Sequence, residues 1–131
     1  MTVFRVIAAL VFLIVSPARA HDHARPELTE WFKGLKSGKG LCCDGHDAVH
    51  LSDTDWVTQN KPNSHYRVQV PATKEGFEAA LKGEVVSQTM WIDIPDDAVV
   101  DEPNKSGAPQ VWPLYGYMGI SIRCFMVGSL T

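Results

Sequence analysis

The densest group of chemically versatile side chains lies at residues 42–50, where thiol, carboxylate and imidazole types follow one another within nine positions. Cys43 and His46 have a spacing at which both could bind one metal ion, with His50 as a further ligand. A free Cys43 thiol with His46 or His50 as base and Asp47 to orient that base would instead form a nucleophile. Triad members usually converge from distant segments, so the alternative is a polar turn held by a disulfide.

A second candidate metal site lies at residues 21–23, His-Asp-His, and depends on cleavage of a leader after Ala20. The free amine, two amide nitrogens and the imidazole of His23 would then form a square-planar set, a geometry that suits Cu(II) or Ni(II). His21 offers another chelate through its own amine and ring. The sequence therefore suggests copper or nickel as a cofactor, with His46 and His50 as further ligands; the alternative is a solvated polar tail.

Residues 1–20 have the order of a cleavable signal peptide. Arg5 gives a short positive segment, residues 6–15 are an unbroken apolar run, and Ala18 and Ala20 fit a cleavage site. A membrane-spanning helix needs about 20 apolar residues, about twice the length of this run. We therefore expect cleavage after Ala20 and a mature chain that is periplasmic or extracellular.

The remainder predicts a polar, flexible amino-terminal arm at residues 21–25 and one small domain at residues 26–131. Without Arg5 and Arg19, ten basic side chains stand against 15 acidic ones, a formal net charge of −5. An acidic chain without a Lys/Arg run has no electrostatic footprint for nucleic acid. No second apolar stretch is long enough to span a membrane, so we expect no membrane association after cleavage.

Three cysteines, Cys42, Cys43 and Cys124, remain in the mature chain. In an oxidising compartment a disulfide is expected. A bond between the neighbours Cys42 and Cys43 would close a strained eight-membered ring. The sequence therefore predicts a bond from Cys43, or Cys42 in its place, to Cys124, with one thiol left over.

Apolar spacing predicts two helices. Leu28, Trp31, Phe32 and Leu35 stand at i, i+3, i+4 and i+7, which indicates an amphipathic helix at residues 26–37 that ends before Gly38. Residues 73–82 predict a short second helix with Thr73 as its N-cap.

The other segments predict an antiparallel sheet of about four or five strands, with turns at residues 53–55 and 59–64. Prolines at 109 and 113 indicate that the strand containing them is an edge or bulged strand. In the last strand, Ile120, Ile122, Cys124 and Met126 are predicted to share one side. The expected strands are residues 49–51, 66–70, 85–94, 110–114 and 119–127. The fold class is therefore α+β, with the amino-terminal helix packed on the sheet and a disulfide tying the two together.

Four short strings carry a resemblance to a group of proteins. They are Trp31-Phe32 with Leu35 and Cys42-Cys43-Asp44 with Asp47; Trp91 to Pro95 with Ala98-Val99-Val100; Asn104 with Gly107; and Ile122-Arg123-Cys124-Phe125. Together they resemble small secreted proteins of rhizobia and related alphaproteobacteria that have no assigned activity. The resemblance spans most of the mature chain and implies export and a disulfide-tied fold. It implies no activity, substrate or catalytic residue.

Aromatic side chains are the remaining candidates for recognition. Tyr115 and Tyr117 lie among glycines in a predicted loop, and Trp112 lies just before them. Our leading hypothesis is a non-enzymatic binding or interaction module that takes a protein or small-molecule ligand at this surface. The alternatives are a Cu(II)- or Ni(II)-binding protein and a thiol-dependent enzyme.

Overall fold

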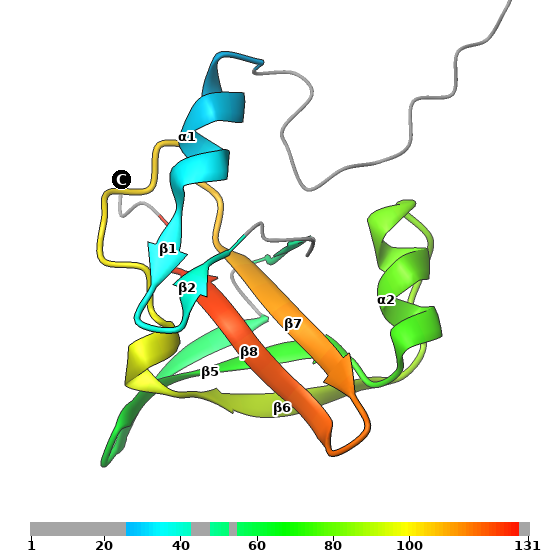
Figure 1. The fold of residues 1–131 in the computed structure, drawn as a ribbon. Helices are drawn as coiled ribbons and strands as arrows, with labels where there is room; N and C mark the ends of the chain where they lie inside the picture. Colours follow the sequence, from blue (N-terminus) through cyan, green and yellow to red (C-terminus); the bar gives the residue numbers. More distant parts are fainter. Residues whose placement is uncertain (1–25, 43–47, 53–54, 129–131) are drawn as a thin grey trace, which may run out of the picture.

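The computed structural model describes residues 26–42, 48–52 and 55–128, and these confirm the α+β class with antiparallel sheets (Figure 1). The predicted signal peptide and amino-terminal arm lie outside the described residues. The elements, in chain order, are the 3₁₀ turn η1 (Pro26–Leu28), α1 (Thr29–Gly34), β1 (Lys36–Ser37), β2 (Gly40–Leu41), β3 (Val49–His50), β4 (Trp56–Lys61), β5 (Ser64–Pro71), α2 (Lys74–Leu81), β6 (Thr89–Ile94), the 3₁₀ turn η2 (Asp96–Ala98), β7 (Gln110–Gly116) and β8 (Gly119–Met126).

The amino-terminal helix presents the predicted face but is shorter than expected. Leu28, Phe32 and Leu35 are buried. Leu35 is already extended, with φ −62° and ψ 135°, and the next two residues form β1 instead of a last helical turn. β1 pairs with β2, and Gly40 takes φ 115°, a conformation that glycine adopts without a Cβ clash.

The second helix is confirmed, together with its cap. The backbone N–H of Gly76 donates to Oγ1 of Thr73 at 3.0 Å, so one of the unpaired first-turn donors of α2 is satisfied. α2 packs against β5 and β3, beside the sheets rather than across them (Figure 1).

The predicted strand count was wrong, because the described residues form eight strands in three sheets. The sheets are β1–β2, β3–β7–β8 and β4–β5–β6. The additional long strand is β4, which forms a hairpin with β5. Asn63 takes φ 60° in the connection, so the turn is confined to Pro62 and Asn63, within the longer predicted turn at residues 59–64.

A bulge in the β7–β8 hairpin divides the core. Trp112 lies opposite Cys124 while Pro113 lies opposite Ile122, so Arg123 is an extra residue on β8. The irregularity falls at Pro113, but the extra residue is on β8 and β7 is the central strand of its sheet, so the prediction that the proline-containing strand is itself an edge or bulged strand was wrong. The bulge also reverses the alternation, since Cys124 packs in one apolar cluster and Ile122 in the other. The prediction that both share one side was therefore wrong.

The β7–β8 hairpin is the middle layer of the molecule. One face packs against α1 in a cluster of Leu28, Phe32, Leu35, Cys42, Ala48, Val100, Trp112, Cys124 and Met126. The other packs against β5 and β6 in a cluster of Leu51, Val68, Val70, Ile94, Ala98, Val111, Ile122 and Phe125. In Figure 1 the hairpin crosses in front of the β5–β6 sheet, and α1 lies near the end of the hairpin that is away from the β7–β8 turn. Within the described ranges, no helix is long and apolar enough to cross a membrane.

Candidate functional site

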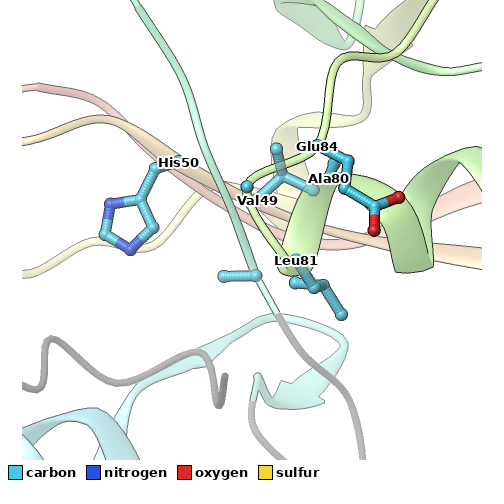
Figure 2. A pocket seen from close by; sticks show the side chains of 7 residues that line it. Val49, His50, Ala80, Leu81 and Glu84 are labelled. Atoms are coloured by element: carbon cyan, nitrogen blue, oxygen red, sulfur yellow. The ribbon is translucent and has the colours of Figure 1, made fainter. Parts of the chain in front are cut away.

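A cleft of about 260 Å³ lies between β3 and the carboxyl end of α2. Its lining residues are Ala48, Val49, His50, Ala80, Leu81, Gly83 and Glu84. Figure 2 shows the imidazole of His50 on the opposite side of β3 from the carboxylate of Glu84. The two titratable side chains therefore do not converge on one point, and short apolar side chains form much of the wall.

Only one of the four predicted metal ligands, His50, lies among the described residues, and it is exposed. His21, His23 and His46 lie outside them. In the part of the chain that the structure describes, no three His, Cys, Asp or Glu side chains are grouped so that they could hold a metal ion. The copper or nickel site therefore stays a prediction.

Titration with Cu(II) tests this prediction. A chain whose first residue is His21 is expected to bind one equivalent, with a visible d–d absorption band and the release of protons from the coordinating amides. A chain extended by one alanine at the amino terminus is the control, because the extension moves His23 out of the third position. Binding no tighter than about micromolar by an authentic His21 terminus would contradict the site.

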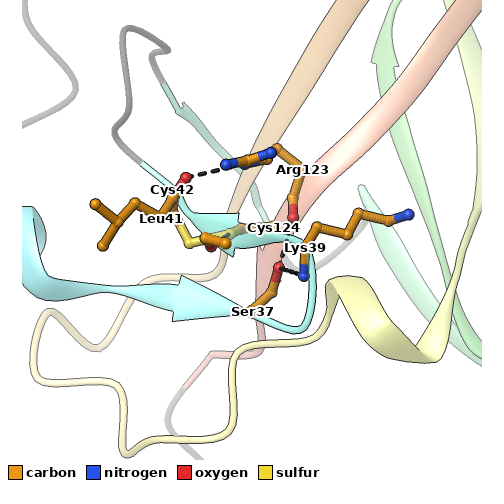
Figure 3. Close-up of a disulfide and its surroundings, with 7 residues drawn as sticks. Ser37, Lys39, Leu41, Cys42, Arg123 and Cys124 are labelled. Carbon is orange, nitrogen blue, oxygen red and sulfur yellow. Dashed lines mark hydrogen bonds between the residues drawn. A yellow bond between two sulfur atoms is a disulfide. The ribbon is translucent and has the colours of Figure 1, made fainter.

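The structure resolves which cysteine pairs with Cys124. The disulfide joins Cys42 to Cys124 across a Cα–Cα distance of 5.6 Å, and both residues are fully buried. Hydrogen bonds on both sides hold the β1–β2 turn against β8 (Figure 3). Ser37 Oγ donates to the carbonyl of Arg123 at 2.8 Å, and Arg123 Nε donates to the carbonyl of Leu41 at 2.9 Å. The bond therefore ties the segment after α1 to the middle layer.

The remaining thiol belongs to Cys43, which lies outside the described residues together with His46 and Asp47. The thiol-dependent enzyme therefore stays a prediction. The described member of that set, His50, lines the cleft, and Figure 2 shows its imidazole directed away from Glu84.

The predicted aromatic loop is the tight turn of the β7–β8 hairpin. Gly116 and Gly119 are the last paired residues, so Tyr117 and Met118 alone form the connection. Gly119 takes φ 112°, which a side chain would disfavour. The side chains of Tyr117 and Met118 are 100% and 92% exposed. An aromatic and a thioether side chain therefore stand together in solvent at the end of a paired hairpin.

Tyr115 anchors this turn to the rest of the protein. Its hydroxyl donates to the carbonyl of Pro71 at 2.6 Å, and its ring lies 5.3 Å from that of Phe77 on α2. Burial raises the pKa of Tyr115 to about 12, so the hydroxyl remains a donor at neutral pH. Trp112 requires a correction: it is fully buried and packs in the cluster under α1, so it offers no surface to a ligand.

The outer face of the β4–β5–β6 sheet is a feature that the sequence did not suggest. Register places Arg67 beside Asp93, and Gln69 beside Trp91, on the face away from β7–β8. The guanidinium carbon of Arg67 lies 5.8 Å from the ring centre of Trp91, a cation–π distance. The alternation of residues 66–70 and 90–94 indicates which side chains point outward, but only the strand register brings them together.

Asp93 is the charged centre of this face. Lys61 Nζ lies 3.0 Å from one carboxylate oxygen, and Gln59 Nε2 donates to the other at 3.2 Å. Arg67 Nε also lies 3.0 Å from the carboxylate, close enough for an ion pair, although its N–H is not directed at the oxygen. The hydrogen bond from Lys61, then that from Gln59, lowers the pKa of Asp93. The carboxylate therefore stays ionised, and the positive charges of its neighbours compensate its charge. These ion pairs are exposed.

Comparisons with known proteins assign no activity to these residues. No protein-family model matches the sequence, no curated protein is significantly similar to it, and no solved structure matches its fold significantly. The function must therefore be argued from the geometry described above.

Proposed function

We infer that this chain is a small exported binding module that contacts its partner through the β7–β8 turn. The observation that carries this proposal is the nearly complete exposure of Tyr117 and Met118, adjacent apolar side chains on a two-residue turn. Exposed apolar side chains that lie together are candidates for a contact surface, and tyrosine is enriched among residues that dominate binding energies.

The support beneath the turn favours recognition of a folded partner. Tyr115 is held by Pro71 and Phe77, and Gly116 pairs with Gly119, so the turn has little freedom to lose on binding. A preorganised loop binds more tightly than a loose one because less conformational entropy is lost. Rigid scaffolds that present binding loops are common among recognition domains. We therefore expect a protein partner with an apolar pocket that accepts the phenol ring and the thioether.

The disulfide is consistent with export. A buried disulfide between Cys42 and Cys124 persists in an oxidising compartment, whereas reducing conditions of the cytosol disfavour it. The apolar run at residues 6–15 supports the same destination through its resemblance to a signal peptide.

Photo-crosslinking in the organism that makes the protein tests the proposal. Tyr117 is replaced by a benzophenone amino acid, and Lys82, exposed at the end of α2, is replaced in the same way as the matched control. We expect one discrete adduct with another protein after irradiation of the Tyr117 variant, and none from the Lys82 variant. Absence of an adduct at Tyr117, or the same ladder of adducts from both positions, would contradict a binding role for the turn.

A double substitution of Tyr117 and Met118 by serine adds a competition arm. Both side chains are exposed, so the free energy of unfolding should change by less than about 0.5 kcal/mol. An excess of unlabelled wild-type protein should suppress the adduct, whereas the same excess of the double variant should not. Equal suppression by both proteins would mean that the turn does not carry the affinity.

A further inference from the structure

Strand β6 leaves one of its edges without a backbone partner among the described residues. It is the last strand of the order β4–β5–β6. The N–H of Gln69 donates to Asp55 on the β4 side, so the even-numbered residues of β5 face β6. Backbone groups alternate between the two sides of a strand, so the N–H and C=O of Trp91 and Asp93 point away from β5. With Thr89, these two residues form a row of backbone donors and acceptors that have no strand partner among the described residues.

The other two long edge strands, β4 and β8, are protected by recognised devices. β4 carries Lys61 and a register irregularity between Thr58 and Lys61, both of which hinder pairing with another chain. β8 is covered on its outer side, where the N–H of Val100 donates to the carbonyl of Phe125 at 2.8 Å. Such features are typical of edge strands that do not pair with another chain.

β6 has no register irregularity, and its one charged residue, Asp93, is paired with Lys61 and Arg67 of the same sheet. Thr89 to Ile94 pair with β5 in unbroken register and contain no proline and no lysine. Met90 and Trp91 are 43% and 37% exposed at this edge. A regular, largely apolar edge strand is a template for a further strand.

We propose that β6 pairs antiparallel with β6 of a second copy of this chain, with the two-fold axis at Trp91. The two β4–β5–β6 sheets would then form one continuous sheet across the dimer. Pairing of a strand with its own copy is isologous, so the same edge is used by both chains and the assembly closes at two. This inference goes beyond the proposed function, since the β7–β8 turn takes no part in it.

The edge is complementary to itself in this register. Trp91 lies opposite the partner's Trp91, and aromatic cross-strand pairs are favourable. Met90 lies opposite the partner's Ile92 on the inner face. Asp93 lies opposite the partner's Thr89, whose hydroxyl can donate to a carboxylate. A register centred on Asp93 would instead place two carboxylates directly opposite each other, which is destabilising.

The seam is small. It consists of one strand pair and the side chains beside it, less than the surface that permanent dimers bury. The dimer is therefore expected to form and dissociate with concentration, and single substitutions on the seam should have large effects.

Sedimentation equilibrium of the purified chain measures self-association. Concentrations from about 1 μM to about 1 mM cover the dissociation constants expected of a modest interface. The average mass of the wild type should rise from one chain towards two. Trp91→Lys should weaken association at least about tenfold, because two ammonium groups would meet at the axis. Val57→Lys is the matched control, because Val57 is exposed on the same face of the opposite edge strand. It should associate like the wild type.

A wild type that remains monomeric at the highest concentration would overturn the proposal, as would equal effects of the two lysine variants.

A crosslinking experiment tests the same contact without relying on the lysine variants, one of which could fail to fold. Opposite residues of a hydrogen-bonded antiparallel pair have Cα atoms about 5.5 Å apart, which suits a disulfide. In a Cys43→Ser background, Trp91→Cys should therefore give a covalent dimer on mild oxidation, and Val57→Cys should not. Failure of Trp91→Cys to crosslink, or equal crosslinking of both variants, would also overturn it.

Discussion

Replacing Cys42 and Cys124 together by alanine is expected to lower the free energy of unfolding by about 2–5 kcal/mol. The bond closes a long loop, with a sequence separation of 82, so its loss restores many conformations to the unfolded chain. Both residues are fully buried, and alanine is chosen because a serine hydroxyl there would need a hydrogen-bond partner. Denaturant unfolding followed by tryptophan fluorescence measures the change.

Cys43→Ser is the control for this pair, because it leaves the disulfide in place and removes the thiol that could exchange with it. It should retain wild-type stability. Reduction of the wild type by dithiothreitol should reproduce the loss seen in the double variant. A double variant that loses less than about 1 kcal/mol would show that contacts of α1 and the β1–β2 turn hold this segment without the bond.

Trp112→Ala is expected to cost about 3–5 kcal/mol, the range for removal of a large aromatic side chain from a core. Trp112 is fully buried in the cluster that joins α1 to the β7–β8 hairpin, so its loss leaves a cavity between two elements. Trp112→Phe should retain most of the stability. Its smaller ring still fills the site in part, and Nε1 of Trp112 has no hydrogen-bond partner among the described residues.

Tyr117→Ala is the matched control, since it removes a similar aromatic side chain that is fully exposed. It should change the free energy of unfolding by less than about 0.5 kcal/mol. Urea unfolding of the three variants at one protein concentration provides the comparison. Equal losses from Trp112→Ala and Tyr117→Ala would contradict the assignment of Trp112 to the core.

Local signals explain why the helices could be predicted. The spacing of Leu28, Phe32 and Leu35 identifies the buried face of α1, and all three are buried. Oγ1 of Thr73 accepts a hydrogen bond from the N–H of Gly76, three residues later. The first turn of α2 therefore carries its own signal in the sequence. The carboxyl end of α1 depends instead on pairing between β1 and β2, a tertiary contact that helical spacing does not contain.

The strands were predicted less completely because their pairing is non-local. Residues of β4 are mainly polar and their burial does not alternate strictly, so the strand is defined by its hairpin with β5 and by the positive φ of Asn63. The bulge at Arg123 is equally hidden. It moves Ile122 to the side of the hairpin opposite to Cys124, although period two places them together.

The residues considered for recognition also differ in whether a local signal or a distant contact determines their exposure. Glycines on both sides of Tyr117 indicate a tight turn, and the exposure of its side chain follows from that local geometry. Trp112 has the same residue class but lies in a paired strand under α1, so its burial depends on a partner far away in the sequence. The cluster of Arg67, Trp91 and Asp93 requires the β5–β6 register, which a single sequence does not reveal.

The position of the β7–β8 hairpin between two apolar clusters has a consequence for biosynthesis. Until residues 110–126 have left the ribosome, neither α1 nor the β5–β6 sheet has the surface that covers it. Most of the chain is therefore translated before a closed core can exist, and folding must join distant segments late. This delay suits the proposed export, because a translocation channel accepts an unfolded chain.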